Sequence, residues 1–364
     1  MKMIHCADLH LDSKLSASLT GEKASARRRE LTGNFRDLVE LAAENDVRAI
    51  LICGDLFDTA HVSRFTENMV LDAVREHPGI LFYYLKGNHD GDIFAELSSI
   101  PTNLFLFTDE WTVYDCDGVR IYGIELDQLN NPSALQNFAP DPRDINIVML
   151  HGQEAESVSK DRAEVINLRL LKNKGIDYLA LGHIHEYRAG QLDAMARYCY
   201  PGCLEGRGFD EAGEHGFVLL DIDTENGIVK DSFVPFAKRR IYVCPVDITG
   251  LLTTSDILGR VKETLADHPA GERDYLKIVL TGTVDVECEK NTEFIEQNIG
   301  RDHYVTRVSD ETAVTVDLGK FEGDETLKGE FVRLVMASGD LSPERKGEIV
   351  RLGLSYFSEA VKLS

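Results

Sequence analysis

The feature that most constrains the fold of this chain is a repeated order of segments over its first two thirds. Short apolar runs alternate with amphipathic stretches, and each run ends abruptly in Gly, Asp, Asn or His. Such alternation is typical of α/β proteins, in which helices connect buried strands. The apolar runs therefore predict strands of an α/β sheet, and the polar residues that follow them predict a site at the strand ends.

Amphipathic stretches precede three of the apolar runs. Residues 22–46, for example, place Leu31, Phe35 and Leu38 on one face, which is the spacing of a helix that packs one side against a sheet. The helices predicted in this way span residues 22–46, 63–76 and 162–172.

The character of the chain changes at a basic link near residues 236–240. A more strand-rich stretch follows, with a predicted helix at 254–268 and no further dense cluster of metal-ligand residue types. The last forty or so residues predict two helical segments that are broken around residues 339–343. We therefore predict a catalytic domain at residues 1–237, a smaller α+β accessory or capping domain at 238–322 and a C-terminal helical segment at 323–364.

Composition limits the classes of protein to which the chain can belong. Hydrophobic residues make up 43% and charged residues 28%, as in ordinary globular proteins. The sequence contains no apolar run of about 18 residues and no signal-peptide apolar block after Met1, so we expect a cytoplasmic protein without a membrane partner. The seven cysteines are scattered and form no C-x-x-C pair, which favours reduced thiols over a disulfide framework or a zinc ribbon.

The net charge bears on any hypothesis about nucleic acid. It is −23, from 62 acidic and 39 basic residues, and a surface of that sign repels polyphosphate at long range. If the protein acts on DNA, it needs a local basic groove, bound metal ions or a partner that supplies positive charge.

Five polar clusters follow the strand-like runs. Each is weak evidence alone, because an Asp-x-His or His-x-His occurs by chance in many chains. Together they are informative, since residues at the carboxyl ends of strands in an open α/β sheet converge on one crevice. The clusters are Asp8-Leu9-His10, Gly54-Asp55-Leu56-Phe57-Asp58, Gly87-Asn88-His89-Asp90, His151-Gly152 and Gly182-His183-Ile184-His185.

The residue types in these clusters indicate a centre of two divalent metal ions. Such a pair, about 3.5 to 4 Å apart, needs a bridging carboxylate, several neutral imidazoles and few thiolates, and it activates a water molecule and polarises a phosphoryl oxygen. Five of the eleven histidines lie in the clusters. The other six are interpreted as surface or structural residues: His5, His61, His77, His215, His268 and His303.

The order of the clusters resembles the pattern of the calcineurin-like metallophosphoesterase superfamily, D-x-H, G-D, G-N-H-D/E, H and G-H-x-H, over residues 8–185. The resemblance implies an α/β fold, a four-layer α-β-β-α sandwich, and two divalent ions. Manganese is the metal that it favours, and the ligand set also suits iron or zinc. By the same resemblance, one ion is held by Asp8, His10 and His185, the other by Asn88, His151 and His183, and Asp55 bridges the two.

The resemblance also gives a catalytic role to a histidine that no metal uses. His89 would protonate the leaving oxygen or steady the transition state, with Asp90 or Asp58 orienting it. Arg207, between two glycines, is a weak candidate for a phosphate contact, because an arginine in such a turn is more often a surface residue.

A narrower resemblance is to the nuclease subunit of bacterial SbcC/SbcD-type DNA-repair complexes, particularly its YhaO-like branch. Cys203 departs from that pattern, where a Ser is common, and so does Leu11-Asp12. The resemblance implies a DNA exonuclease or phosphodiesterase that acts on DNA ends in double-strand break repair, with a coiled-coil SMC-like ATPase as partner and homodimerisation. The residues that carry it are Gly54-Asp55-Leu56-Phe57-Asp58, Tyr200-Pro201-Gly202, Gly206-Arg207-Gly208-Phe209-Asp210-Glu211 and Gly329-Glu330-Phe331-Val332-Arg333.

Two other functions fit the same residues. A metallophosphatase or phosphodiesterase of small nucleotides or phosphoproteins would use the same fold and be indifferent to DNA. A non-catalytic scaffold with a structural metal site is disfavoured by His89 in the acid position. The apolar faces of the C-terminal helices are equally suited to binding the partner and to packing on the protein's own core.

Overall fold

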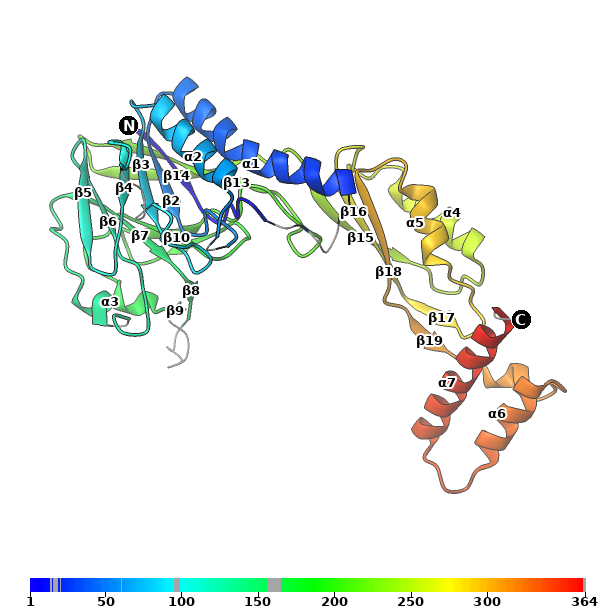
Figure 1. Cartoon of the computed structure of the whole chain (residues 1–364). Helices are drawn as coiled ribbons and strands as arrows, with labels where there is room; N and C mark the ends of the chain where they lie inside the picture. Colours follow the sequence, from blue (N-terminus) through cyan, green and yellow to red (C-terminus); the bar gives the residue numbers. More distant parts are fainter. Residues whose placement is uncertain are drawn as a thin grey trace. The chain divides into compact units, whose positions relative to one another are not determined.

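The computed structural model describes residues 1–13, 15, 19, 21–59, 61–94, 99–131, 133–155 and 165–362 (Figure 1). The chain divides into two compact units, Met1–Arg240 and Ile241–Ser364. The division into three parts at residues 237 and 322 stays a prediction.

Two six-stranded sheets form the centre of the first unit. One contains β1 (Lys2–Cys6), β2 (Val47–Cys53), β3 (Leu81–Leu85), β4 (Leu104–Leu106), β13 (Gly216–Asp223) and β14 (Ile228–Pro235). The other contains β5 (Thr112–Cys116), β6 (Val119–Gly123), β7 (Ile145–His151), β10 (Tyr178–Gly182), β11 (Arg188–Gln191) and β12 (Arg197–Tyr200). Their spatial orders are β14-β13-β1-β2-β3-β4 and β11-β12-β10-β7-β6-β5. Strands β1, β2 and β3 are parallel neighbours, as are β7 and β10.

Apolar side chains fill the space between the two sheets, and they also cover the outer face of each sheet. Met3 and Leu51 of the first sheet share one cluster with Met149 and Ala180 of the second. A second cluster lies between the first sheet and helices α1 (Gly21–Glu44) and α2 (Arg64–Glu76), which run side by side (Figure 1). A third covers the outer face of the second sheet with α3 (Ser133–Asn137). These layers confirm the predicted α-β-β-α sandwich.

The backbones of the two sheets approach each other closely at Gly182, the last residue of β10. A Cβ atom on this residue would lie 1.8 Å from the carbonyl oxygen of Cys53, at the end of β2. No side chain fits in that distance, so the two backbones pack directly against each other at the edge where the strands end.

Two of the three helices predicted in this unit are confirmed. Helix α1 occupies most of residues 22–46, and α2 starts after Ser63, whose hydroxyl oxygen accepts from the amide of Thr66 (3.3 Å), a standard N-cap. The helix predicted at 162–172 is wrong over its described residues, and residues 162–164 lie outside them. Strand β9 (Val165–Ile166) instead pairs with β8 (Gln153–Glu154), and one 3-10 turn, η1 (Leu168–Leu170), follows.

Side-chain hydrogen bonds explain this difference. The side-chain amide nitrogen Nδ2 of Asn131 donates to the carbonyl oxygen of Val165 (2.8 Å), and Oδ1 of Asn167 accepts from the backbone amide of Arg169 (3.1 Å). Both bonds hold the backbone away from a continuous helix, because Asn side chains compete with helical hydrogen bonds.

The second unit has its own core. Strands β15 (Ile241–Asp247), β16 (Tyr275–Thr281) and β18 (Val305–Asp310) are parallel, and α4 (Thr254–Leu265) and α5 (Thr292–Ile299) connect them. Strand β17 (Thr283–Asp285) pairs with β19 (Ala313–Thr315). The 3-10 helix η2 (Leu318–Phe321), α6 (Leu327–Ala337) and α7 (Pro343–Lys362) pack around Val332, Val350 and Leu354. Within the described residues, no helix is both long enough and apolar enough to cross a membrane.

Candidate metal centre

The loops after the parallel strands of both sheets meet at one edge of the sandwich. They are joined by backbone hydrogen bonds: the amide of Asp8 donates to Gly54 (3.1 Å), and that of Gly152 donates to Gly182 (3.1 Å). All seven predicted metal ligands lie in these loops or at a strand end. The fold therefore brings together residues that are up to 177 positions apart, from Asp8 to His185.

The backbone at four predicted ligands is in the left-handed region. Their φ angles are 54° at Asp8, 45° at His10, 51° at Asp55 and 103° at His183. Each such residue other than glycine costs on the order of 1–3 kcal/mol and persists only where the surroundings fix it. Strain of this kind is typical of functional sites.

Gly54 allows a ligand to approach the chain closely. Its φ is 84°, and a Cβ atom would lie 2.1 Å from Nδ1 of His151. Glycine is therefore needed here both for its backbone conformation and for space.

Asp8, His10 and His185 form one group of ligand atoms. Their ligand atoms lie within 4.8 Å of one another, and Nε2 of His10 is 3.1 Å from Nε2 of His185. Asp8 and His10 are each 1% exposed. These are the three residues predicted to hold one ion.

A second group contains Asn88, His151 and His183. Oδ1 of Asn88 is 3.0 Å from Nε2 of His151 and 3.3 Å from Nδ1 of His183. Asp55 lies between the groups, because its Oδ2 is 3.5 Å from Nε2 of His151 and 3.7 Å from Nε2 of His10. One carboxylate thus reaches an imidazole of each group, as a bridging ligand must.

Hydrogen bonds on the far side of the rings set the tautomers. Nδ1 of His151 is 2.9 Å from the carbonyl oxygen of Cys53. A carbonyl only accepts, so Nδ1 carries a proton, and Nε2 is the nitrogen that faces the site and would bind a metal ion. Nδ1 of His185 is 2.8 Å from Oε1 of Glu211, with the same result. This donor set of carboxylate, amide and imidazole groups fits divalent metal ions.

Burial and mutual charge shift the pKa values in the centre. Burial raises the pKa of Asp8 to about 6. Burial also acts on Asp55 and His151, but their mutual contact outweighs it, lowering the pKa of Asp55 and raising that of His151. The two side chains therefore form an ion pair in the metal-free protein, and a bound metal would displace the imidazolium proton.

His89 lies on the open side of the centre and its side chain is exposed. Its amide donates to Oδ1 of Asp55 (2.9 Å), and its Nδ1 lies 3.3 Å from the carbonyl oxygen of Asp58. Its ring is 5.0 Å from that of His10. The imidazole is thus held beside the ligands with one face toward solvent.

The carboxylates predicted to orient His89 have other partners. Asp90 accepts from the amides of Phe57 (2.8 Å) and Gly87 (3.0 Å), so it fastens two loops together. The carboxylate of Asp58 faces His10, and Asp58 reaches His89 through its backbone carbonyl.

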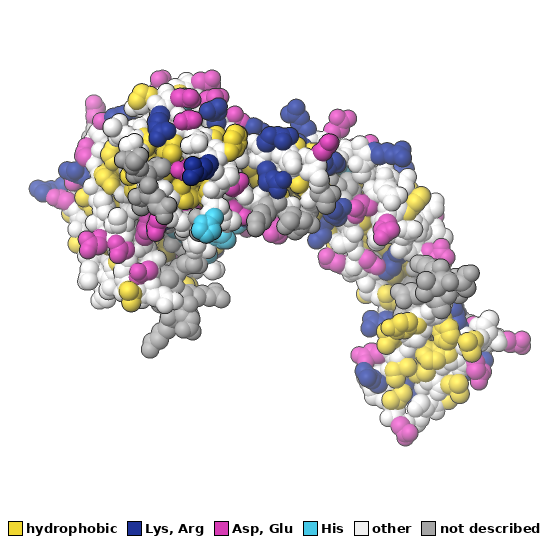
Figure 2. Space-filling model, in the orientation of Figure 1, with side chains coloured by type: hydrophobic (Ala, Val, Ile, Leu, Met, Phe, Trp, Pro, Cys, Tyr) yellow, Lys and Arg dark blue, Asp and Glu magenta, His cyan; other side chains and the backbone are white. Residues whose placement is uncertain are grey.

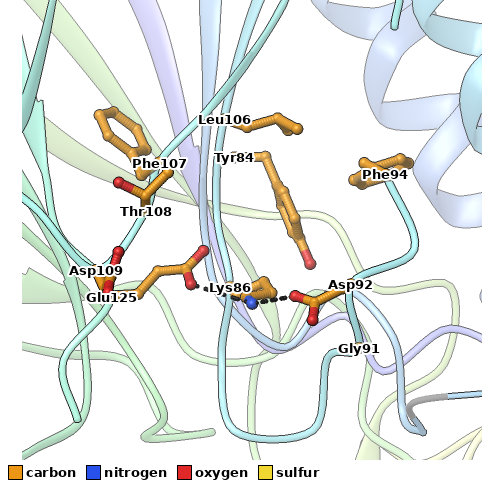
Figure 3. Close-up of a pocket in the computed structure, with 10 residues that line it drawn as sticks. All are labelled: Tyr84, Lys86, Gly91, Asp92, Phe94, Leu106, Phe107, Thr108, Asp109 and Glu125. Carbon is orange, nitrogen blue, oxygen red and sulfur yellow. Dashed lines mark hydrogen bonds and ion pairs between the residues drawn. The ribbon is translucent and has the colours of Figure 1, made fainter. Parts of the chain in front are cut away.

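Lys86 anchors the loop that carries Asn88 (Figure 3). Its ammonium group is 2.5 Å from Asp92 and 3.1 Å from Glu125. Glu125 follows β6, so the Lys86–Glu125 pair joins the loop after β3 of the first sheet to the one after β6 of the second. The three charged side chains line a cavity of about 390 Å³, together with aromatic residues such as Tyr84.

Sequence reasoning missed Glu211 as a site residue. Its carboxylate accepts from Arg207 and contacts His185, and these contacts outweigh burial and lower its pKa. The contact with His185 spans 26 residues, so no local spacing reveals it. Its only sequence signal was its place in the segment 206–211. The guanidinium of Arg207, predicted as a weak phosphate contact, is bound to Glu211 and Asp58.

A second cavity, of about 750 Å³, opens beside His183 and His185. Its wall is acidic, with Glu186, Asp210 and Glu214. The surface next to the candidate centre is therefore acidic, like the chain as a whole.

Comparisons with known proteins extend these observations. A family model for calcineurin-like phosphoesterases matches residues 1–187. The chain is 30% identical over 340 residues to the uncharacterized metallophosphoesterase YhaO of Bacillus subtilis, a match that covers 86% of this chain and 82% of that one. It is 25% identical over 337 residues to the DNA double-strand break repair protein Mre11 of Methanopyrus kandleri, covering 82% and 72%. The solved structure of TT1561 of Thermus thermophilus is similar over 64% of this chain and 98% of that one, at 13% identity and a TM-score of 0.39.

Proposed function

The chain belongs to the calcineurin-like phosphoesterase family, and from that membership we propose that it is a two-metal nuclease that hydrolyses DNA at its ends during double-strand break repair. The observation that carries the proposal is the position of Asp55, whose Oδ2 lies 3.7 Å from His10 and 3.5 Å from His151. It supports two neighbouring metal positions with one shared carboxylate.

The residues of the centre have distinct tasks in this proposal. Two bound divalent ions would supply an activated water molecule and polarise the phosphoryl oxygen. His89 holds a proton for the leaving oxygen: its Nδ1–H donates to Asp58, and in the imidazolium form its Nε2–H is free to donate. The exposed position of His89 leaves space for a phosphodiester beside it.

Support for DNA as the substrate comes from the relative named Mre11, which matches 82% of this chain. We propose manganese as the metal, because the donor set is made of carboxylate, amide and imidazole groups without a thiolate. The ligand set suits iron or zinc as well. Metal analysis of the purified protein would identify the ion.

The proposal includes a coiled-coil ATPase as partner. The acidic centre and the net charge of −23 give DNA little attraction of its own, so a partner has to supply positive charge. Figure 2 shows apolar side chains gathered over α6 and α7. Leu327 and Leu334 of α6 and Tyr356 of α7 are 70%, 65% and 66% exposed. A helical partner would cover this surface, and homodimerisation stays a prediction.

The acidic cavity also favours a second candidate function. Glu186, Asp210 and Glu214 beside the centre disfavour a long polyanion more than a small phosphoester. A phosphodiesterase or phosphatase of small nucleotides or phosphoproteins would therefore use the same centre without a partner.

Digestion of an end-labelled DNA duplex with manganese tests the proposal, with wild type and His89→Ala compared in the presence and absence of the ATPase. Hydrolysis of bis-p-nitrophenyl phosphate is followed in parallel. The wild type is expected to shorten the DNA, and His89→Ala is expected to leave it intact. Cleavage of the small ester with DNA left intact in both settings would contradict the nuclease and support the second candidate.

A further inference from the structure

Three residues outside the two ligand groups form a chain of ion pairs behind His10 and His185. Nη1 of Arg207 is 2.9 Å from Oδ1 of Asp58, and Nη2 of Arg207 is 2.7 Å from Oε1 of Glu211. We call Asp58, Arg207 and Glu211 the charged bridge. One guanidinium thus holds two carboxylates at a fixed separation.

Each carboxylate of the charged bridge also reaches one imidazole ligand. Oδ1 of Asp58 is 3.1 Å from Nδ1 of His10, and Oε1 of Glu211 is 2.8 Å from Nδ1 of His185. The Nε2 atoms of the same two rings face each other at 3.1 Å. Glu211 of the bridge therefore orients the imidazole of His185 by a hydrogen bond, and Asp58 places a negative charge beside the imidazole of His10.

The surroundings hold the charged bridge in place. Glu211 is 9% exposed, and its Oε2 accepts from the amide of Arg207 (2.7 Å). The carbonyl oxygen of Glu211 accepts from Nε2 of His215 (2.8 Å), a buried ring that also lies 3.2 Å from the sulfur of Cys203. The loop around Glu211 is thus fixed from both sides of the carboxylate.

In the other metal position, the group behind the imidazole of His151 is uncharged. Nδ1 of His151 donates to the neutral carbonyl oxygen of Cys53 (2.9 Å). A carboxylate behind an imidazole makes its ligand nitrogen more basic than a carbonyl does, and it orients the ring more firmly. The carboxylate of Asp8 in one position and the amide of Asn88 in the other already differ in charge. The bridge adds a second difference, because His185 has a carboxylate behind its ring and His151 a neutral carbonyl.

We propose that Asp58, Arg207 and Glu211 are positioning residues that make the position of Asp8, His10 and His185 the tighter of the two, so that it fills first. The inference rests on the proposed two-metal centre. Arg207 serves in it by holding two carboxylates that would otherwise repel each other.

Calorimetric titration of the metal-free full chain with Mn²⁺ tests this inference. The wild type is expected to bind two ions with unequal affinities. Glu211→Gln preserves the size of the side chain and removes its charge, and it is expected to weaken the tighter event by about 10–100-fold while the weaker event is unchanged. His185→Ala and Asn88→Ala assign the events, since each removes a ligand from one position only.

Two further variants separate a local effect from a general one. Glu225→Gln removes the same charge from an exposed residue in the turn between β13 and β14 and is expected to bind Mn²⁺ as the wild type does. Arg207→Lys keeps the positive charge of the bridge but cannot bind both carboxylates as the guanidinium does. The affinity of the tighter Mn²⁺ site is therefore expected to fall. This variant provides the test if Glu211→Gln does not fold.

The outcomes distinguish the inference from the proposed function. A folded wild type that binds no Mn²⁺ overturns the metal centre itself. Two wild-type events with an unchanged tight event in both Glu211→Gln and Arg207→Lys overturn only the charged bridge. Equal weakening of both events also overturns it, because the bridge contacts the imidazoles of one position. Binding of two Mn²⁺ ions with equal affinity by the wild type would also overturn the charged bridge.

Discussion

At the scale of single residues, the centre depends on backbone space as much as on ligand chemistry. Gly54→Ala would place a methyl group 2.1 Å from Nδ1 of His151, at a φ of 84°. We expect this variant to lose Mn²⁺ affinity, measured by titration, and to lose stability to urea, because His151 must move from its ligand position.

Gly118→Ala is the matched control for that variant. Gly118 has a φ of 89°, and a methyl group added there would meet nothing within 4 Å, so alanine incurs backbone strain of about 1–2 kcal/mol without a clash. Equal losses of stability and unchanged Mn²⁺ binding in both variants would show that the contact with His151 does not matter.

His5 makes a separate prediction about pH. Its side chain is buried, with Nδ1 3.0 Å from the hydroxyl of Tyr178 and Nε2 3.1 Å from the carbonyl of Leu181. Burial lowers the pKa of His5 to about 3, from 6.5. The unfolded chain therefore takes up a proton below about pH 6.5 that the folded chain does not, and stability falls as pH falls, by up to about 1.4 kcal/mol per pH unit.

Urea unfolding between pH 7 and 5 measures this effect. His5→Gln is expected to flatten the pH dependence by the contribution of one proton, whereas His61→Gln, at an exposed residue, leaves it as in the wild type. The same slope in wild type and His5→Gln would show that His5 is not the group responsible.

The predicted metal ligands could be grouped from sequence because each lies at the end of an apolar run or within a few residues after it. Glu211 could not, since the ligand that it contacts, His185, lies 26 positions away in the chain. The difference is physical: strand ends are set by local pattern, while the charged bridge depends on how the loop of residues 201–215 folds over them.

At the scale of elements, periodicity predicted α1 and α2 well because each buries one face on a sheet. It failed at residues 165–172, where an Asn side chain at position 131 draws the backbone into strand pairing. Hydrogen bonds from distant side chains leave no periodic trace in the segment that receives them.

Helices α6 and α7 carry a prediction about the partner. Leu334→Glu on α6 replaces a side chain that is 65% exposed, so it should change stability by no more than about 0.5 kcal/mol. It should weaken binding of the ATPase, measured by surface plasmon resonance, while hydrolysis of bis-p-nitrophenyl phosphate is unchanged. Phe65→Glu, at a residue that is 72% exposed on α2, is the control. Equal binding by both variants and the wild type would argue against this docking surface.

At the scale of the whole molecule, the metal centre lies within one of two units that each have a core. Calorimetric unfolding is therefore expected to show two transitions. Mn²⁺ at about 100 times its Kd should stabilise only the first unit, by about 2.7 kcal/mol for each site, and a chelator should reverse the shift. A metal-dependent shift of both transitions would contradict a centre confined to Met1–Arg240.

The contact at Gly182 has a consequence for how the protein tolerates change. Four ligands come from loops of the first sheet and three from the second, and the backbones of the two sheets meet at Gly182 and Cys53. The spacing between the two sets of predicted ligands therefore depends on a contact between main-chain atoms. A substitution of a core side chain elsewhere cannot compensate for the loss of this contact. In a saturation mutagenesis screen, Gly182 would rank with the metal ligands in intolerance, while neighbouring core positions would accept other apolar residues.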